Sequence, residues 1–159
     1  MGSDSDAPVM QAAVDVLGEL GIPCEMTVAS AHRSPERVMR LVREAPSRGV
    51  KAYIVGAGAA AHLAGVVAAH TTAPVIGVPI DSSALKGLDA LLSTVQMPPG
   101  VPVATVSIGK PGATNAGVLA AQILAIGDRS IAARLEQYKK TLADKVEKAA
   151  ARLASGADA

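Results

Sequence analysis

Short apolar runs alternate along this chain with longer segments in which apolar residues recur every three or four positions. The short runs are typical of buried β-strands, and the longer segments are typical of helices that cover a sheet. Turns rich in Gly, Ser, Pro or Asp separate them. The pattern predicts strands over 24–29, 52–55, 74–78 and 103–106, turns or loops over 56–58 and 109–112, and helices over 7–20, 34–48, 60–70, 85–95, 113–125 and 128–153.

This order of elements indicates an α/β fold with a parallel sheet covered by helices on both faces. No linker, repeat or low-complexity segment divides the sequence, so we expect residues 1–159 to form a single domain. The last predicted helix, 128–153, has no strand after it to return to. Its apolar stripe leaves two alternatives, packing on its own domain or docking on another subunit, and the apolar excess of the chain favours docking.

The composition excludes several classes of protein. Half of the residues are apolar, 18% are charged, the net charge is +1, and two tyrosines are the only Phe, Trp or Tyr residues. A disordered chain would be more polar, and a protein that binds single-stranded nucleic acid needs rings on which bases stack. Cys24 has no second cysteine with which to form a disulfide or a cysteine metal cluster. We therefore expect a cytoplasmic protein without membrane or nucleic-acid partners.

Candidate chemistry lies in the loops that follow strands, where parallel sheets bind their ligands. The segment 2–6, Gly-Ser-Asp-Ser-Asp, offers hydroxyls and a helix N-terminus to a phosphate and carboxylates to a ribose, although a simple helix cap remains an alternative. The segment 30–35 contains His32, which can exchange a proton near neutral pH, and Arg33, whose planar guanidinium suits an anion. A solvated loop is the alternative there.

The loop 56–62 is built of small residues whose backbone N–H groups could hold a carboxylate or CO2. Its last residue, His62, falls inside the predicted helix 60–70, and a packing role is favoured for it. Two further candidates are 81–83 and 109–112, and the latter lacks the spacing of a Walker phosphate loop. This inventory suits proton transfer on a small phosphorylated substrate, without a metal or a redox cofactor.

Several of these segments, taken together and in order, resemble the PurE family of purine biosynthesis. The resemblance runs from residue 1 to roughly 145 and rests on Gly2-Ser3-Asp4-Ser5-Asp6, Ser30-Ala31-His32-Arg33, the segment 56–63, Gln96-Met97-Pro98, and the segments 109–116 and 120–124. It implies a flavodoxin-like three-layer α/β/α sandwich and a homo-octamer with active sites between subunits.

The resemblance also implies a reaction. Segments 96–98 and 120–124 look like the class that converts N5-carboxyaminoimidazole ribonucleotide to 4-carboxy-5-aminoimidazole ribonucleotide in de novo IMP biosynthesis, moving a carboxylate from N5 to C4 through decarboxylation and recarboxylation. The ribonucleotide is the only small-molecule partner implied, with no cofactor. Two alternatives stay open: a carboxylase that uses CO2 and aminoimidazole ribonucleotide directly, and a non-catalytic module that binds a phosphate or a nucleotide.

The motif positions assign roles by resemblance. His32 would shuttle the C4 proton, and Ala57 and Gly58 would hold the migrating carboxylate. The residues expected to contact or neighbour the substrate are Ser3, Ser5, Asp6, Ser30 and Arg33.

The sequence departs from the family in three places. Ala59 stands where the family usually has Gly, and Ala64 where it has Pro. The family also has a strand directly before the segment 2–6, inside the sheet. Without that strand we expect a groove in the core, unpaired backbone groups on both sides of it, and a melting temperature that rises when an apolar strand is added upstream.

Overall fold

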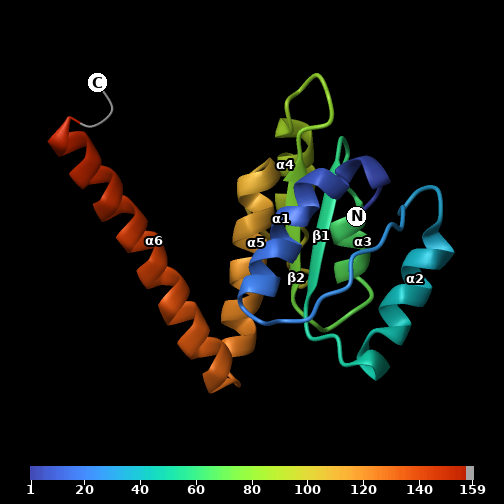
Figure 1. Cartoon of the computed structure of the whole chain (residues 1–159). Coiled ribbons are helices and arrows are strands. Elements are labelled where there is room, and N and C mark those ends of the chain that lie inside the picture. Colours follow the sequence, from blue (N-terminus) through green and yellow to red (C-terminus); the bar gives the residue numbers. More distant parts are fainter. Residues whose placement is uncertain (157–159) are drawn as a thin grey trace.

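The computed structural model describes residues 1–156, and it contains a parallel sheet. The strands are β1 (Tyr53–Gly58), β2 (Val75–Ile80) and β3 (Ala104–Thr105), in the order β1-β2-β3 (Figure 1). Every position of β2 is buried, as expected for a strand covered on both faces. Ile76 of β2 lies opposite Ile54 of β1 and Ala104 of β3. The predicted α/β class with a parallel sheet is confirmed.

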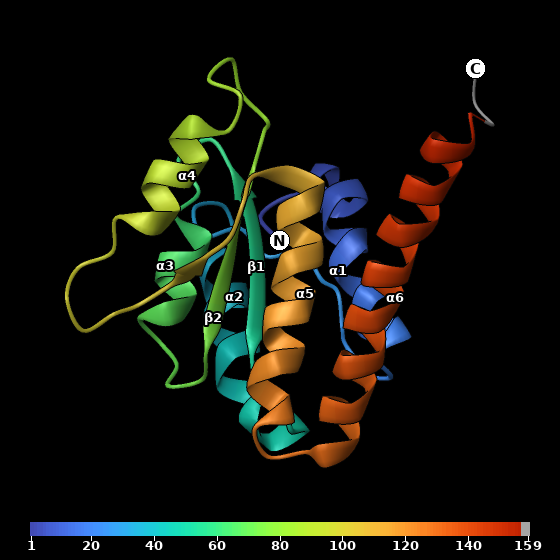
Figure 2. The ribbon, with the colours of Figure 1, turned by 90° about the vertical axis from the view of Figure 1, so that its left-hand side faces the viewer.

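Helices form a layer on each face of this sheet (Figure 2). Buried side chains divide into two clusters accordingly, with Ile76 and Val78 in one and Val55 and Ala57 in the other. The first layer comprises α1 (Ala7–Glu19), α5 (Gly109–Ala125) and α6 (Arg129–Ser155), and the second α2 (Pro35–Glu44), α3 (Leu63–Ala68) and α4 (Leu88–Val95). The structure is therefore an α/β/α sandwich.

Two predicted helices are too long because the backbone turns left-handed before them. Ala59 and Ala61 have φ values of 51° and 39°, so the helix predicted over 60–70 begins only at Leu63. Gly87, at φ 83°, likewise delays α4 to Leu88. A third helix, predicted over 34–48, is too long at its C-terminal end. It stops at Glu44, because Pro46 cannot continue it and begins a 3₁₀ turn, η2 (Pro46–Arg48).

The turn predicted over 56–58 is wrong, because β1 continues through Gly58. The two glycines serve close packing instead. A Cβ at Gly56 would collide with the Met10 sulfur, and one at Gly58 would collide with the Ser82 hydroxyl. The loop predicted over 109–112 is also wrong. These residues form the first turn of α5, where a proline is tolerated, and Gly112 lies against the carbonyl of Ser107.

The strand predicted over 24–29 is not part of the sheet in the described chain. Its only backbone–backbone hydrogen bonds within residues 1–156 are with Met1, whose amine donates to the Thr27 carbonyl at 3.0 Å and whose carbonyl accepts from the Ala29 N–H at 2.9 Å. The Val28 carbonyl accepts from Arg37 Nε at 2.7 Å. A groove of about 740 Å³ separates this segment from β1. The prediction failed because an apolar run needs a neighbouring strand, and the groove lies where that neighbour would be.

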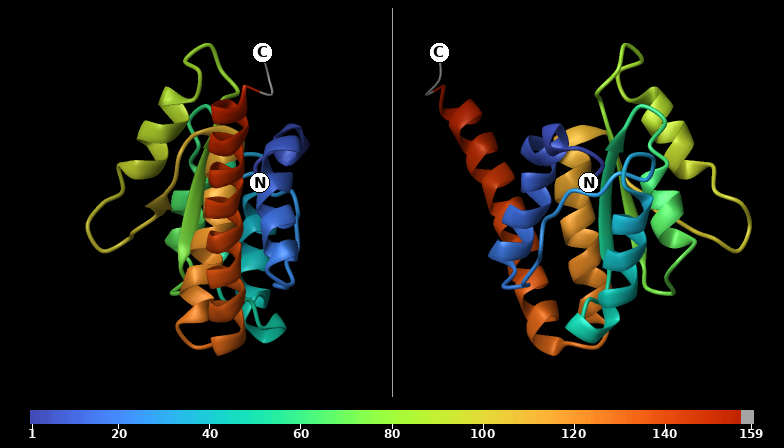
Figure 3. Two further views of the ribbon diagram at one scale, coloured as in Figure 1. Left: turned by 60° about the vertical axis from the view of Figure 1, so that its left-hand side comes forward. Right: turned by 90° about the vertical axis from the view of Figure 1, so that its right-hand side faces the viewer.

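The final helix packs on the body along its first half only. Ile131 and Leu135 are buried, whereas Leu142 and Val146 are 44% and 67% exposed. The helix α6 diverges from the sandwich toward its C-terminal end (Figure 3). The first alternative therefore holds near the start of α6, which packs on its own domain. The second half of α6 presents apolar side chains without a partner in residues 1–156, and its docking on another subunit stays a prediction. No helix among these residues is long and apolar enough to cross a membrane.

Candidate functional site

Three loops, the segments 2–6, 30–35 and 56–62, meet at the end of the sheet where β1 finishes, and hydrogen bonds join them. The Arg33 guanidinium donates to the Gly2 carbonyl at 3.1 Å, which joins the second loop to the first. The Nε2 atom of His32 lies 2.8 Å from Nδ1 of His62, which joins the second loop to the third. The loops chosen from the sequence thus form one cluster, at the position expected for a ligand site in a parallel sheet.

The first loop folds into a short 3₁₀ turn, η1 (Asp4–Asp6), capped by Ser3. The Ser3 N–H donates to Asp6 Oδ2 at 3.1 Å, and the Ser5 hydroxyl donates to the Ser3 hydroxyl at 2.8 Å. Asp6 is only 5% exposed, and this burial raises its pKa, against the opposing effects of the Ser3 N–H and the Met1 ammonium. The Asp6 carboxylate is therefore turned into its own loop, which leaves the two hydroxyls outside.

The second loop is held tight by serine hydroxyls. Ser30 Oγ accepts from the Arg33 backbone N–H at 3.2 Å and from Arg33 Nε at 3.4 Å, while Ser34 Oγ accepts from the Ser30 N–H at 3.0 Å. These bonds place the exposed Arg33 guanidinium beside the first loop. A planar cation in this position, next to the Ser3 and Ser5 hydroxyls, suits a phosphate or carboxylate.

Of the two histidines, only His32 was predicted from the sequence to take part in the site. His62 is exposed and contacts His32, so the favoured packing role for it is wrong. Because α3 begins at Leu63, His62 lies in the loop and not inside a helix. The two rings meet edge to face, with centroids 4.9 Å apart and planes at 81°. One ring must donate and the other accept, so a single proton lies between them.

The third loop closes tightly after β1. Ala57 is buried and paired with Pro79 of β2, and the Gly58 carbonyl accepts from the Ala61 N–H at 3.0 Å. Gly58 lies against Ser82, which belongs to the segment 81–83 that the sequence also marked. The loop residues before His62 all have small side chains, which suits a group of few atoms beside this ring.

Comparisons with known proteins identify relatives of this chain. Residues 1–145 match the family model described as AIR carboxylase. This chain belongs to the AIR carboxylase family. It is 56% identical over 140 residues to the N5-carboxyaminoimidazole ribonucleotide mutase of Bacillus subtilis (strain 168), covering 88% of this chain and 86% of that protein. It is 54% identical over 153 residues to the protein of the same name from Pyrococcus horikoshii, covering 96% and 85%.

A solved structure agrees with this assignment to the AIR carboxylase family. The crystal structure of Treponema denticola PurE superposes with a TM-score of 0.87 at 30% identity, covering 96% of this chain and 94% of that chain. The expected flavodoxin-like fold is therefore confirmed. Within residues 1–156 of this AIR carboxylase family member, no three His, Cys, Asp or Glu side chains lie close enough together to hold a metal ion.

Proposed function

We propose that this chain is an N5-carboxyaminoimidazole ribonucleotide mutase, which converts its substrate to 4-carboxy-5-aminoimidazole ribonucleotide in IMP biosynthesis. Relatives of that name, 52–56% identical over most of the chain, support it. The observation that carries the proposal is the meeting of an exposed histidine pair with a small-residue loop at the end of β1. This arrangement provides a proton carrier next to a space for a carboxylate.

The first two loops bind the ribonucleotide in this proposal. The Ser3 and Ser5 hydroxyls and the Arg33 guanidinium contact the phosphate, with Ser30 holding Arg33 in place. Two aspartates in the first loop would repel a phosphate if both faced it. Asp6 avoids this because it is buried and accepts the Ser3 N–H. Its contact with a ribose hydroxyl is the role that the family motif implies for it.

The third loop holds the carboxylate while it migrates. The N5–carboxyl bond breaks, its electrons return to N5, and the released CO2 stays beside Ala57 and Gly58. C4 then attacks this CO2, forming the new carbon–carbon bond. His32 takes the C4 proton, and the matching proton goes to N5, so the reaction is a balanced isomerisation. Holding CO2 in place replaces an encounter from solution by an intramolecular one, which is worth several orders of magnitude in rate.

Contact with His62 fixes the orientation of the His32 ring. His62 Nδ1 contacts His32 Nε2, so the opposite edge of the His32 ring, with Nδ1, is held in one orientation. We assign His62 as a positioning residue that selects the His32 tautomer. The assignment follows because a neutral imidazole donates at one nitrogen and accepts at the other.

The proposal extends to assembly and location. His32, Arg33 and His62 are exposed on the single chain, and a reaction that retains CO2 needs a site closed to water. A homo-octamer of one-domain subunits in the cytoplasm would cover these loops. Exposed apolar side chains offer the required contacts: Leu85, Leu88, Leu92, Val95, Leu142, Val146 and Leu153.

The test supplies each candidate substrate separately. With N5-carboxyaminoimidazole ribonucleotide and no bicarbonate, the mutase proposal predicts full turnover. Rapid turnover of aminoimidazole ribonucleotide with bicarbonate, and none of the first compound, would assign the chain to direct carboxylation instead. Binding of either compound without turnover would leave a non-catalytic binding module.

A further inference from the structure

The loop that follows β2, residues 81–87, lies against the third loop of the candidate site. Gly58 of β1 is paired with Ile80 of β2, so the chain that leaves β2 starts beside the end of β1. A Cβ at Gly58 would collide with the Ser82 hydroxyl and would approach the Ile80 carbonyl to 3.2 Å. The Ser82 hydroxyl therefore occupies the space over Gly58 that a side chain would otherwise fill.

This hydroxyl lies on the face of β1 that is next to the first loop. Successive residues of a strand direct their side chains to opposite faces, so Gly56 and Gly58 share a face. A Cβ at Gly56 would collide with Met10 of α1, and the Gly56 carbonyl accepts from the Gly2 N–H at 3.2 Å. Ser82 thus reaches across the end of β1 to the side on which the proposed function places the ribonucleotide.

The third loop has no side-chain donor of its own before His62. Residues 56–61 are all glycine or alanine, so within them only backbone N–H groups can donate to a carboxylate. One of these, the Ala61 N–H, already donates to the Gly58 carbonyl at 3.0 Å. A carboxylate has two oxygens with about four acceptor sites, so it can accept further hydrogen bonds from a neighbouring segment.

Ser82 is available for such a bond, whereas the serine next to it is used by its own loop. Ser83 Oγ donates to Asp89 Oδ2 of α4 at 2.7 Å and accepts from the Leu85 N–H at 3.1 Å. The Ser83 carbonyl accepts from the Lys86 N–H at 3.1 Å. These bonds fix the backbone beside Ser82, whose side chain is exposed and forms no hydrogen bond within residues 1–156.

We propose that Ser82 is a further binding residue of this site, an assignment that rests on the proposed function: its hydroxyl donates a hydrogen bond to the migrating carboxylate beside Gly58. A hydroxyl suits this position because it donates without carrying a charge. It can bind the anionic carboxylate of substrate and product and still lie beside neutral CO2. Ser82 thereby distinguishes a carboxylated ribonucleotide from one that has lost its carboxylate.

The test compares two ribonucleotides that differ only in the carboxylate, 4-carboxy-5-aminoimidazole ribonucleotide and aminoimidazole ribonucleotide. Each is titrated calorimetrically into the full chain carrying His32→Asn, so that neither ligand is turned over. Adding Ser82→Ala should weaken binding of the carboxylated ligand by about tenfold or more, as expected for loss of a hydrogen bond to a charged group, and should change binding of the other by no more than about twofold.

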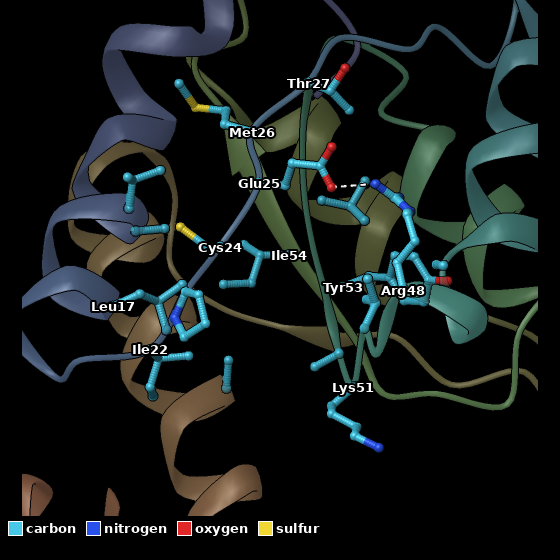
Figure 4. A pocket seen from close by; sticks show the side chains of 18 of the residues that line it. Leu17, Ile22, Cys24, Glu25, Met26, Thr27, Arg48, Lys51, Tyr53 and Ile54 are labelled. Carbon is cyan, nitrogen blue, oxygen red and sulfur yellow. Dashed lines mark hydrogen bonds and ion pairs between the residues drawn. The ribbon is translucent and has the colours of Figure 1, made fainter.

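Two further variants separate a contact from a change of shape. Ser82→Thr keeps the hydroxyl and should restore most of the lost affinity. Ser47→Ala removes an exposed hydroxyl near the opposite end of β1, next to Arg48, which lines the groove together with Tyr53 (Figure 4). This control should leave the affinity for both ribonucleotides unchanged.

The outcomes distinguish this assignment from the proposed function. Equal losses of affinity for the two ribonucleotides, or no loss for either, would overturn the role of Ser82 and leave the proposed function standing. If the chain binds neither ribonucleotide before Ser82 is changed, the proposed function fails and the role of Ser82 fails with it.

Discussion

The Nε2 atom of His32 lies 2.8 Å from Nδ1 of His62, although the two residues are 30 positions apart in the sequence. They come from different loops, one after the segment 22–29 and one after β1. Their contact therefore links the orientation of the proton carrier to the loop that would hold the carboxylate. A substitution in either loop should therefore change the orientation of His32 and, with it, the reaction rate.

Replacing His32 removes the group that we propose carries the C4 proton. We expect His32→Asn to lower kcat by about 10² to 10⁴, the usual contribution of a positioned acid or base, with KM changed only a few-fold. Because the side chain is exposed, the melting temperature should stay the same. Steady-state kinetics with the purified ribonucleotide measure this. His70→Asn, an exposed histidine beyond α3, is the matched control and should be fully active.

Replacing His62 tests a positioning role. His62→Ala should lower kcat by about tenfold, as expected for loss of one hydrogen bond of ~1–1.5 kcal/mol, and should leave KM unchanged. His62→Asn places an amide where Nδ1 lies and should restore most of the rate. If both variants behave alike, the contact with His32 has no part in turnover.

Because the Asp6 carboxyl is buried, we expect its replacement to leave stability at pH 7 intact while substrate binding is lost. Its folded pKa is raised above the ordinary 3.8 chiefly by burial, so the folded protein binds this proton more readily than the unfolded chain does. Its contribution to the free energy of unfolding is greatest at low pH and is lost as the pH rises through the folded value. Asp6→Asn should therefore be at least as stable as the parent at pH 7.

The same variant should lose substrate binding. A hydrogen bond to a charged group contributes about 1.5–3 kcal/mol, so kcat/KM should fall roughly 10- to 150-fold. Urea unfolding at pH 4 and pH 7 measures the stability difference, and kinetics measure the loss. If Asp6→Asn is less stable than the parent at pH 7 and more stable than it at pH 4, the expected pH dependence of stability is contradicted.

Left-handed backbone at Ala59 predicts a stabilising substitution. Its φ of 51° costs an L-residue about 1–2 kcal/mol, while glycine loses roughly 0.5–1 kcal/mol more chain entropy on folding. Ala59→Gly should therefore stabilise the fold by about 0.5–1 kcal/mol in chemical denaturation. Ala60→Gly, next to it and outside the left-handed region, is the control and should destabilise.

The main features of the fold could be predicted from local pattern. The apolar run of β2 predicted a buried strand, and the pattern after the capping residue Asp128 predicted the final helix. The motif loops also placed the segments 2–6 and 30–35 close together, and Arg33 does contact the Gly2 carbonyl. These inferences hold because strand order and loop position follow from the repeated alternation of strand and helix.

What the sequence could not show depends on tertiary contacts. The glycines of β1 read as a turn, because the close approach of Met10 and Ser82 that requires them comes from distant segments. The segment 24–29 was predicted to be a strand, because a strand pattern does not reveal whether a neighbouring strand is present. His62 read as a helix residue, because the positive φ of Ala61 before it has no signature in an alanine.

The most direct measurement of the central claim follows the carboxylate itself. N5-carboxyaminoimidazole ribonucleotide labelled with ¹³C in its carboxylate is incubated with the protein in unlabelled bicarbonate, and the product is analysed by mass spectrometry. Transfer within a closed site predicts that the product retains the label and that its rate of formation is independent of bicarbonate. A product that carries unlabelled carbon, formed in proportion to bicarbonate, would contradict the mutase assignment.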